Sequence, residues 1–142
     1  MTVAPSIVIV DDEVTLAVLM RTLVLQGWPD AQISVFTDPL NLAPRLMEIP
    51  YGSVVLMDQR LGGTDSYGAI STLLATRPDL RVAMLSASLG ADERSRARAA
   101  GAFAAYEKPS ALGGWRQLLQ EVISGSQAGR SLSPDVDPAV AS

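Results

Sequence analysis

Short, continuous runs of apolar residues recur along the chain, separated by longer stretches with helical spacing. The first run, Ser6 to Val10, is β-branched from its second residue onward and does not alternate with polar residues. Such a run predicts a strand that is covered on both faces of a parallel sheet, because a half-exposed strand would alternate. Four later runs have the same character, at residues 32–36, 53–57, 81–85 and 102–106.

Helix-length segments follow each of these runs, and their ends carry capping residues. Asp38 and Pro39 open the second segment as an N-cap and a first-turn proline, and Pro44 inside it predicts a kink or a late start. Gly101 predicts a C-cap for the fourth helix, and Ser110 an N-cap for the fifth. Apart from the second, we expect helices at residues 14–26, 65–76, 91–100 and 110–124.

Five βα units in succession predict an α/β fold, with a five-stranded parallel sheet and helices on both faces. The length of 142 residues suits one domain with a single core. We place this domain at residues 1–124. From residue 125 the composition changes to Gly, Ser, Pro, Asp and Ala, which predicts a flexible tail or the start of a linker over 125–142.

Composition removes several classes of function. The chain contains neither cysteine nor histidine and has a net charge of −4, so thiolate sites and histidine catalysis are excluded. The densest basic stretch, Arg94, Arg96 and Arg98, consists of alternate residues that do not share a helix face, so we expect no direct nucleic-acid binding. No secretory signal or membrane span is visible, and we expect a cytoplasmic protein without membrane contact.

Polar residues capable of chemistry stand at the end of four of the predicted strands. Asp11 and Asp12 follow the first strand, Asp58 the third and Lys108 the fifth, while Ser86 closes the fourth. The carboxyl ends of parallel strands form one edge of the sheet, and ligand sites of open α/β sheets lie there. Three carboxylates, one hydroxyl and one ammonium are therefore predicted to meet in one crevice.

This combination of groups suits phosphoryl transfer assisted by a magnesium ion. Clustered carboxylates repel each other unless a cation balances them, and Mg²⁺ favours one or two carboxylates together with a phosphate. An ionised Asp58 could then attack a phosphoryl donor and form an acyl phosphate. Lys108 could pair with the transferred group, and the Ser86 hydroxyl could donate to one of its oxygens.

Taken singly, each of these residues has an ordinary structural explanation. Asp11 or Asp12 alone would be read as a turn or helix cap, Ser86 as a satisfied hydroxyl and Lys108 as a solvated charge. Their occurrence together at one edge of the sheet favours a functional site over these separate structural explanations. Lys108 is also the one lysine in a chain whose other ten basic residues are arginine, and the two side chains are not interchangeable.

Four segments together resemble the signature segments of response-regulator receiver domains. They are residues 7–13 (IVIVDDE), 55–58 (VLMD), 85–87 (LSA) and 108–109 (KP), and the resemblance covers residues 6–124 in the expected order. It implies a flavodoxin-like fold with strand order 2-1-3-4-5. It also implies a phosphoacceptor switch that assists its own phosphorylation and dephosphorylation, and not an enzyme in the usual sense.

The resemblance further assigns roles around Asp58. A histidine kinase or phosphotransfer protein would phosphorylate this residue. Asp12 and Asp58 look like direct ligands of Mg²⁺, with Asp11 acting through water and the carbonyl of Arg60 completing the set.

Two more roles come from the same resemblance. Ser86 matches the switch hydroxyl and Lys108 the lysine that senses the phosphate, with a cis bond to Pro109 expected.

The chain departs from the usual receiver pattern at two places. Leu61-Gly62-Gly63 replaces the proline and glycine that receivers often carry after the phosphoacceptor, which predicts a freer loop. Receivers usually carry a rotating aromatic ring three residues before the lysine, but here that position is Ala105, and Tyr106 should point to the other face of the strand. Trp115 in the fifth helix is interpreted as a core residue, with a partner-facing role as the alternative.

The output of the switch is open from sequence alone. The chain could be a stand-alone receiver that binds a protein partner or dimerises through the fourth helix, fifth strand and fifth helix. It could also be the receiver of a longer regulator with a DNA-binding or enzymatic output domain. A magnesium-dependent aspartyl phosphatase is disfavoured, because that chemistry wants a second acid where Arg60 stands.

Overall fold

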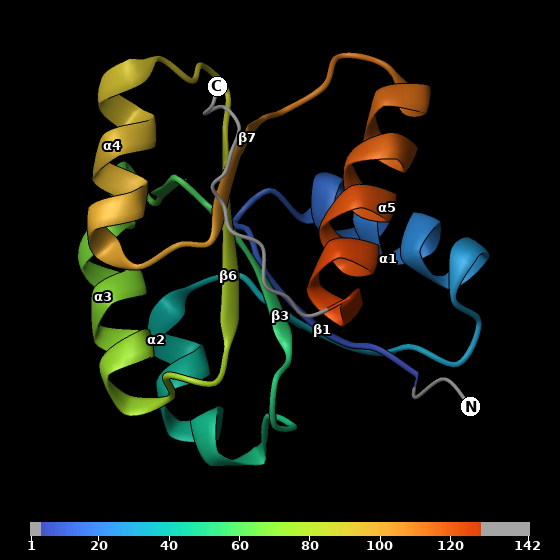
Figure 1. Cartoon of the computed structure of the whole chain (residues 1–142), viewed down its shortest axis with the longest axis horizontal. Helices are drawn as coiled ribbons and strands as arrows, with labels where there is room; N and C mark the ends of the chain where they lie inside the picture. Colours follow the sequence, from blue (N-terminus) through green and yellow to red (C-terminus); the bar gives the residue numbers. More distant parts are fainter. Residues whose placement is uncertain (1–3, 129–142) are drawn as a thin grey trace.

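The computed structural model describes residues 4–128, which form one five-stranded parallel sheet with helices on both faces (Figure 1). The strand order is β2-β1-β3-β6-β7, which confirms the predicted order once the two short strands β4 and β5 are set aside. The five strands of this sheet are β1 (Ser6–Val10), β2 (Gln32–Phe36), β3 (Val54–Asp58), β6 (Arg81–Ser86) and β7 (Ala104–Glu107). The fold class predicted from the apolar runs is therefore confirmed.

The helices divide between the two faces of the sheet. In Figure 1, α1 (Val14–Gly27) and α5 (Leu112–Ala128) lie on one side of the strands. On the opposite side lie α2 (Pro39–Leu42), the 3-10 helix η1 (Ala43–Glu48), α3 (Tyr67–Thr76) and α4 (Ala91–Ala100). Alternate side chains of each central strand therefore meet two separate hydrophobic layers.

Several helix ends follow the predicted chemistry and one does not. The Asp38 carboxylate accepts the Leu40 N–H at 2.8 Å, and the helix changes to 3-10 geometry just before Pro44. Gly101 ends α4 with φ of +108°, a conformation that glycine adopts readily. Ser110 was expected to cap the fifth helix, but α5 begins at Leu112 and its first turn is bonded to the carbonyl of Ala111.

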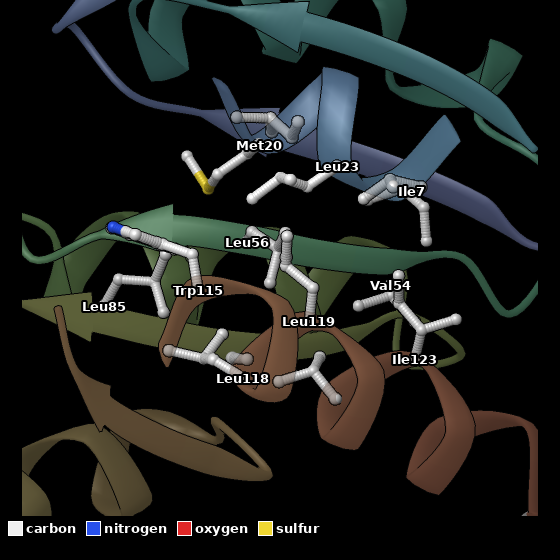
Figure 2. Packing of buried hydrophobic residues seen from close by; sticks show 14 of the residues in the cluster. Ile7, Met20, Leu23, Val54, Leu56, Leu85, Trp115, Leu118, Leu119 and Ile123 are labelled. Carbon is white, nitrogen blue, oxygen red and sulfur yellow. The ribbon is translucent and has the colours of Figure 1, made fainter. Parts of the chain in front are cut away.

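The core on the α1 and α5 side, which we call the α1/α5 core, includes Trp115 (Figure 2). Only 5% of Trp115 is exposed, which confirms the core interpretation over a partner-facing role. The other members of this core come from α1, the central strands and α5, and include Ile7, Met20, Leu23, Leu56, Leu85 and Leu119. This layer fixes α5 against the sheet close to the chain segment that carries Lys108.

The second layer, the α3/α4 core, lies on the other face of the sheet. It includes Val8, Val10, Val55, Met57, Tyr67, Ile70, Val82, Met84 and Ala97. Ala97 is the one buried residue of α4, whose remaining surface is largely charged. The contact of α4 with the sheet therefore depends on a small side chain.

A short hairpin between β3 and α3 was not predicted. Its strands, β4 (Arg60–Leu61) and β5 (Thr64–Asp65), pair antiparallel around Gly62 and Gly63, which have φ of +61° and +84°. Because of the hairpin, α3 begins at Tyr67 and not at the predicted residue 65. The glycine pair thus forms a tight turn beside the site, where a freer loop was expected.

The fifth helix extends to Ala128, four residues beyond its predicted end. The first four residues of the predicted tail are therefore helical, and residues 129–142 lie outside the described part of the chain. Between residues 4 and 128, no helix is long and apolar enough to cross a membrane.

A partly buried ion pair fastens the segment that leads into β3. The Arg77 guanidinium donates to both carboxylate oxygens of Asp79, at 2.8 and 2.7 Å, and to the carbonyls of Leu46 and Ile49. Asp79 also accepts the N–H of Gly52 at 2.8 Å. The side chains of the pair are only 12% and 10% exposed. The guanidinium lowers the pKa of Asp79 to about 2.

We expect Asp79→Asn to lower the free energy of unfolding by about 2 kcal/mol at neutral pH, because charged hydrogen bonds are lost. The folded-state pKa lies below the ordinary value of 3.8, so this stabilisation is complete above pH 4 and disappears as the pH falls through about 2. Urea unfolding from pH 7 to pH 2 measures the difference. Glu48→Gln, which breaks an ion pair whose side chains are 61% exposed, is the matched control. An equal effect of the two substitutions would refute this account.

Candidate functional site

The structure brings the five predicted site residues to the carboxyl edge of the sheet. Asp58 is the last residue of β3 and Ser86 the last residue of β6. Asp11 and Asp12 directly follow β1, and Lys108 directly follows β7. The neighbouring strands β1, β3, β6 and β7 are paired in parallel register, so these positions converge as the sequence predicted.

The three aspartates form a compact acidic cluster. Asp11, Asp12 and Asp58 each offer one carboxylate oxygen within 4.8 Å of the other two. Asp11 and Asp58 are 1% and 8% exposed, whereas Asp12 lies at the surface. The cluster thus faces solvent on one side and the sheet on the other.

Backbone N–H groups orient each carboxylate. Asp11 accepts the N–H of Glu13 at 2.8 Å through Oδ1, and Asp12 accepts the N–H of Gly62 at 2.9 Å through Oδ2. The N–H of Arg60 lies 3.4 Å from Oδ1 of Asp58. The Gly62 contact links the unpredicted hairpin to the acidic cluster and gives this glycine turn a place in the site.

Lys108 supplies the one ammonium of the site. Its Nζ lies 3.1 Å from Oδ2 of Asp58 and 3.7 Å from Oδ2 of Asp11, and its side chain is 17% exposed. One ammonium facing three carboxylates leaves an excess of negative charge. A bound cation would balance this excess.

Burial raises the pKa of Asp11 to about 6, although the Glu13 N–H and Lys108 both lower it. The neighbouring Asp58 raises it further. The Oδ2 atom of Asp11 is buried and accepts no hydrogen bond from any described residue, although the Lys108 ammonium lies 3.7 Å away as an ion-pair partner. A buried carboxylate oxygen without a donor is costly unless it meets a cation or an ordered water.

These features fit a hard divalent cation. The donors are oxygens only, two of the carboxylates are buried, and one buried oxygen lacks a hydrogen bond. Asp11, Asp12 and Asp58 could hold Mg²⁺, which prefers carboxylates together with waters and a phosphate oxygen.

A pocket of about 480 Å³ opens beside Asp12. It lies between the start of α1, the start of α2 and the β4–β5 hairpin. The lining residues are Asp12, Val14, Thr37, Asp38, Asn41, Leu61 and Gly62. The exposed side of the acidic cluster is therefore accessible to a small molecule from solvent.

Ser86 is fully buried and already engaged. Its Oγ lies within hydrogen-bonding distance of Oε1 of Gln59 and 2.7 Å from the carbonyl of Ser88, and it accepts the Ser88 N–H at 3.2 Å. Nε2 of Gln59 in turn donates to the hydroxyl oxygen of Tyr67 at 2.9 Å. Sequence reasoning missed Gln59 and Tyr67, because no local signal tells which way a residue beside Asp58 will point.

The register of β7 settles where the aromatic side chain stands. Ala105 pairs with Met84 and contacts the α3/α4 core, whereas Tyr106 pairs with Leu85 and contacts the α1/α5 core. Burial, with Glu121, raises the pKa of Tyr106 to about 12. The prediction that Tyr106 points to the face opposite Ala105 is confirmed.

One expectation from the resemblance is wrong. No cis peptide bond occurs within residues 4–128, so the bond between Lys108 and Pro109 is trans, the isomer that X–Pro bonds generally favour. The Arg60 side chain donates to the carbonyl of Gly63 at 2.7 Å. Its own carbonyl remains a predicted cation ligand.

Comparison with known proteins agrees with this geometry. The model of the family described as response regulator receiver domain matches residues 7–121. A search of curated proteins finds no match.

Solved structures share the fold at low sequence identity. The receiver domain of a DNA-binding response regulator from Colwellia psychrerythraea superposes with a TM-score of 0.71 at 20% identity, covering 84% of this chain and 98% of that one. The Mn²⁺-bound response regulator Rcp1 gives 0.74 at 17% identity, covering 91% and 99%. A phosphorylated cyanobacterial phytochrome response regulator gives 0.72 at 16% identity, covering 86% and 95%.

Proposed function

Because the chain belongs to the family of response regulator receiver domains, we propose that Asp58 accepts a phosphoryl group in a Mg²⁺-dependent reaction. The observation that carries the proposal is the acidic cluster of Asp11, Asp12 and Asp58, with Lys108 3.1 Å from the Asp58 carboxylate. The donor would be a histidine kinase or a phosphotransfer protein. The protein would thus act as a phosphoacceptor switch that assists its own reaction.

Each residue has a defined part in this chemistry. A carboxylate oxygen of Asp58 attacks the phosphorus atom, a new O–P bond forms, and the leaving group departs with the electron pair of its own bond to phosphorus. Lys108 neutralises charge on the transferred group from the β7 side. Asp12, Asp58 and the carbonyl of Arg60 would hold Mg²⁺ directly, with Asp11 acting through a water molecule. When bound, the ion stabilises negative charge on the phosphoryl oxygens.

The modified site would then be read out on one face of the molecule. Ser86 can donate its hydroxyl proton to a phosphoryl oxygen, which would displace the loop between β6 and α4. The face formed by α4, β7 and α5 lies next to this loop and is the proposed docking surface for a protein partner or a second copy. The Mn²⁺-bound and phosphorylated response regulators with the same fold support both the cation and the modification.

A second candidate function differs in how the signal is passed on and leaves the chemistry of the site unchanged. The chain could serve as the receiver of a longer regulator, as the solved DNA-binding response regulator suggests. An aspartyl phosphatase gains no support, because the residue two positions after Asp58 is Arg60, which supplies no second acid.

Incubation with acetyl phosphate and Mg²⁺, followed by intact mass measurement, tests the proposal. We expect the mass to rise by one phosphoryl group as acetate is released, and a chelator to prevent the change. An unchanged mass with Mg²⁺ present, or equal phosphorylation in the chelator, would contradict the proposed function.

A further inference from the structure

Gln59 occupies a central position between the site and the α3/α4 core. It directly follows Asp58, and its side chain bridges two groups with its two ends. Oε1 faces the Ser86 hydroxyl, and Nε2 donates to the Tyr67 hydroxyl oxygen at 2.9 Å. The Gln59 N–H donates to the Leu85 carbonyl at 2.7 Å, and its own carbonyl accepts the Ser66 N–H at 2.7 Å. The backbone of Gln59 is thus held by two hydrogen bonds, and its side-chain amide is the group that can change when the site changes.

Tyr67 extends this connection to α4. Its ring is 9% exposed within the α3/α4 core, and the Arg96 guanidinium of α4 lies 4.7 Å from the ring centroid. Such a cation–π contact holds the helix surface against the ring. Ser86, Gln59, Tyr67 and Arg96 therefore form a continuous series of contacts from the carboxyl edge of the sheet to α4.

This series is one polar connection between the site and α4. A second runs through the β6–α4 loop, where Ser86 contacts the Ser88 carbonyl and the Leu89 N–H donates to Glu107 at 3.1 Å. The methyl group of Ala105 has no side-chain torsion that could change on activation. Tyr106 faces the α1/α5 core on the other side of the sheet. A ring in β7 therefore cannot carry a signal to α4 by rotating into the α3/α4 core.

We propose that Gln59 positions the Ser86 hydroxyl in the unmodified protein, and that Gln59 and Tyr67 transmit its movement to α4 when Asp58 is phosphorylated. This inference rests on the proposed function and names the regulation of the same site. Gln59 is a positioning residue, because it acts on the phosphoryl group only through Ser86.

The Ser86 hydroxyl has a single proton, which gives the connection from Ser86 through Gln59 to Tyr67 two alternative hydrogen-bonding states. In this structure the proton is available to Gln59 or to the carbonyl of Ser88, and Ser86 can donate it to only one acceptor at a time. When Ser86 donates to a phosphoryl oxygen instead, Oε1 of Gln59 loses its donor. The Gln59 amide then pairs with another group, and its hydrogen bond to the Tyr67 hydroxyl changes. The Tyr67 ring moves relative to the Arg96 guanidinium as a result.

Removal of one oxygen atom tests this series. Tyr67→Phe keeps the ring and its contact with Arg96 but loses the acceptor for Gln59. Tyr106→Phe is the matched control, because it removes the same atom on the opposite face of the sheet. Wild type and both variants are examined by NMR with Mg²⁺, with and without beryllofluoride as a phosphoryl mimic. Amide shifts at Asp58, Ser86 and Lys108 report occupancy, and amide exchange across α4 reports the response.

All three proteins are expected to show the shifts at the site. Wild type and Tyr106→Phe should also change the exchange of α4, whereas the change in Tyr67→Phe should be about fivefold smaller, the contribution of one neutral hydrogen bond. An undiminished α4 response in Tyr67→Phe, with normal site shifts, would overturn the inference and leave the proposed function intact. The absence of site shifts in wild type would overturn both.

A second variant keeps the test decisive if Tyr67→Phe proves unstable. Gln59→Met has a similar shape but no polar ends, so Ser86 loses one competing acceptor and Tyr67 loses its donor. We expect beryllofluoride to bind this variant at least as tightly as wild type, with the α4 response lost. Weaker binding together with a preserved α4 response would contradict the positioning role.

Discussion

Replacement of Asp12 by asparagine is expected to weaken Mg²⁺ binding by about a hundredfold, since even outer-shell partners of metal ligands are worth ten- to a hundredfold. Asp12 is the exposed member of the acidic cluster, so the substitution removes a charge without burying an unpaired amide. Its neighbours Asp11 and Asp58 remain held by the backbone N–H groups of Glu13 and Arg60. The fold should therefore be preserved while the cation is lost.

Calorimetric titration with Mg²⁺ measures this effect directly. Asp92→Asn is the matched control, because Asp92 is an aspartate whose side chain is 77% exposed on α4. The control should bind Mg²⁺ like the wild type. Equal affinities for wild type and Asp12→Asn would show that the cation does not bind at this cluster.

Replacement of Trp115 by alanine should lower the free energy of unfolding by about 4 kcal/mol. Trp115 is 5% exposed and belongs to a core formed by side chains of α1, the central strands and α5, so its removal leaves a cavity in the α1/α5 core (Figure 2). Urea unfolding measures the loss. Leu112→Ala in the same helix is the control, because Leu112 is 47% exposed and should cost less than about 1 kcal/mol. Similar costs for the two variants would contradict the packing described here.

The strands and the carboxyl-edge residues could be predicted because their signals are local. A β-branched apolar run such as Ile7 to Val10 suits only a strand covered on both faces. Once parallel strands are assumed, the residue after each strand must lie at the same edge, which places Asp11, Asp58 and Lys108 together without knowledge of the coordinates. The alanine-rich last strand begins two residues later and ends one residue later than predicted, because alanine has little strand preference.

Other features could not be predicted because they depend on tertiary contacts. The β4–β5 hairpin has only two residues in each strand, too few for a periodic pattern. The link from Ser86 through Gln59 to Tyr67 joins residues of β6, the β3–β4 junction and α3, and each of them alone is an unremarkable polar side chain. The trans bond before Pro109 corrects an expectation that came from the resemblance and not from the residues themselves.

The identity of the phosphorylated residue is the most direct test of the account. Wild type, Asp58→Asn and Asp65→Asn are incubated with acetyl phosphate and Mg²⁺, and the intact mass of each is followed over time. Asp65 is an exposed aspartate of the adjacent hairpin and serves as the matched control. The account predicts one added phosphoryl group on wild type and Asp65→Asn, and none on Asp58→Asn. Undiminished phosphorylation of Asp58→Asn would contradict it.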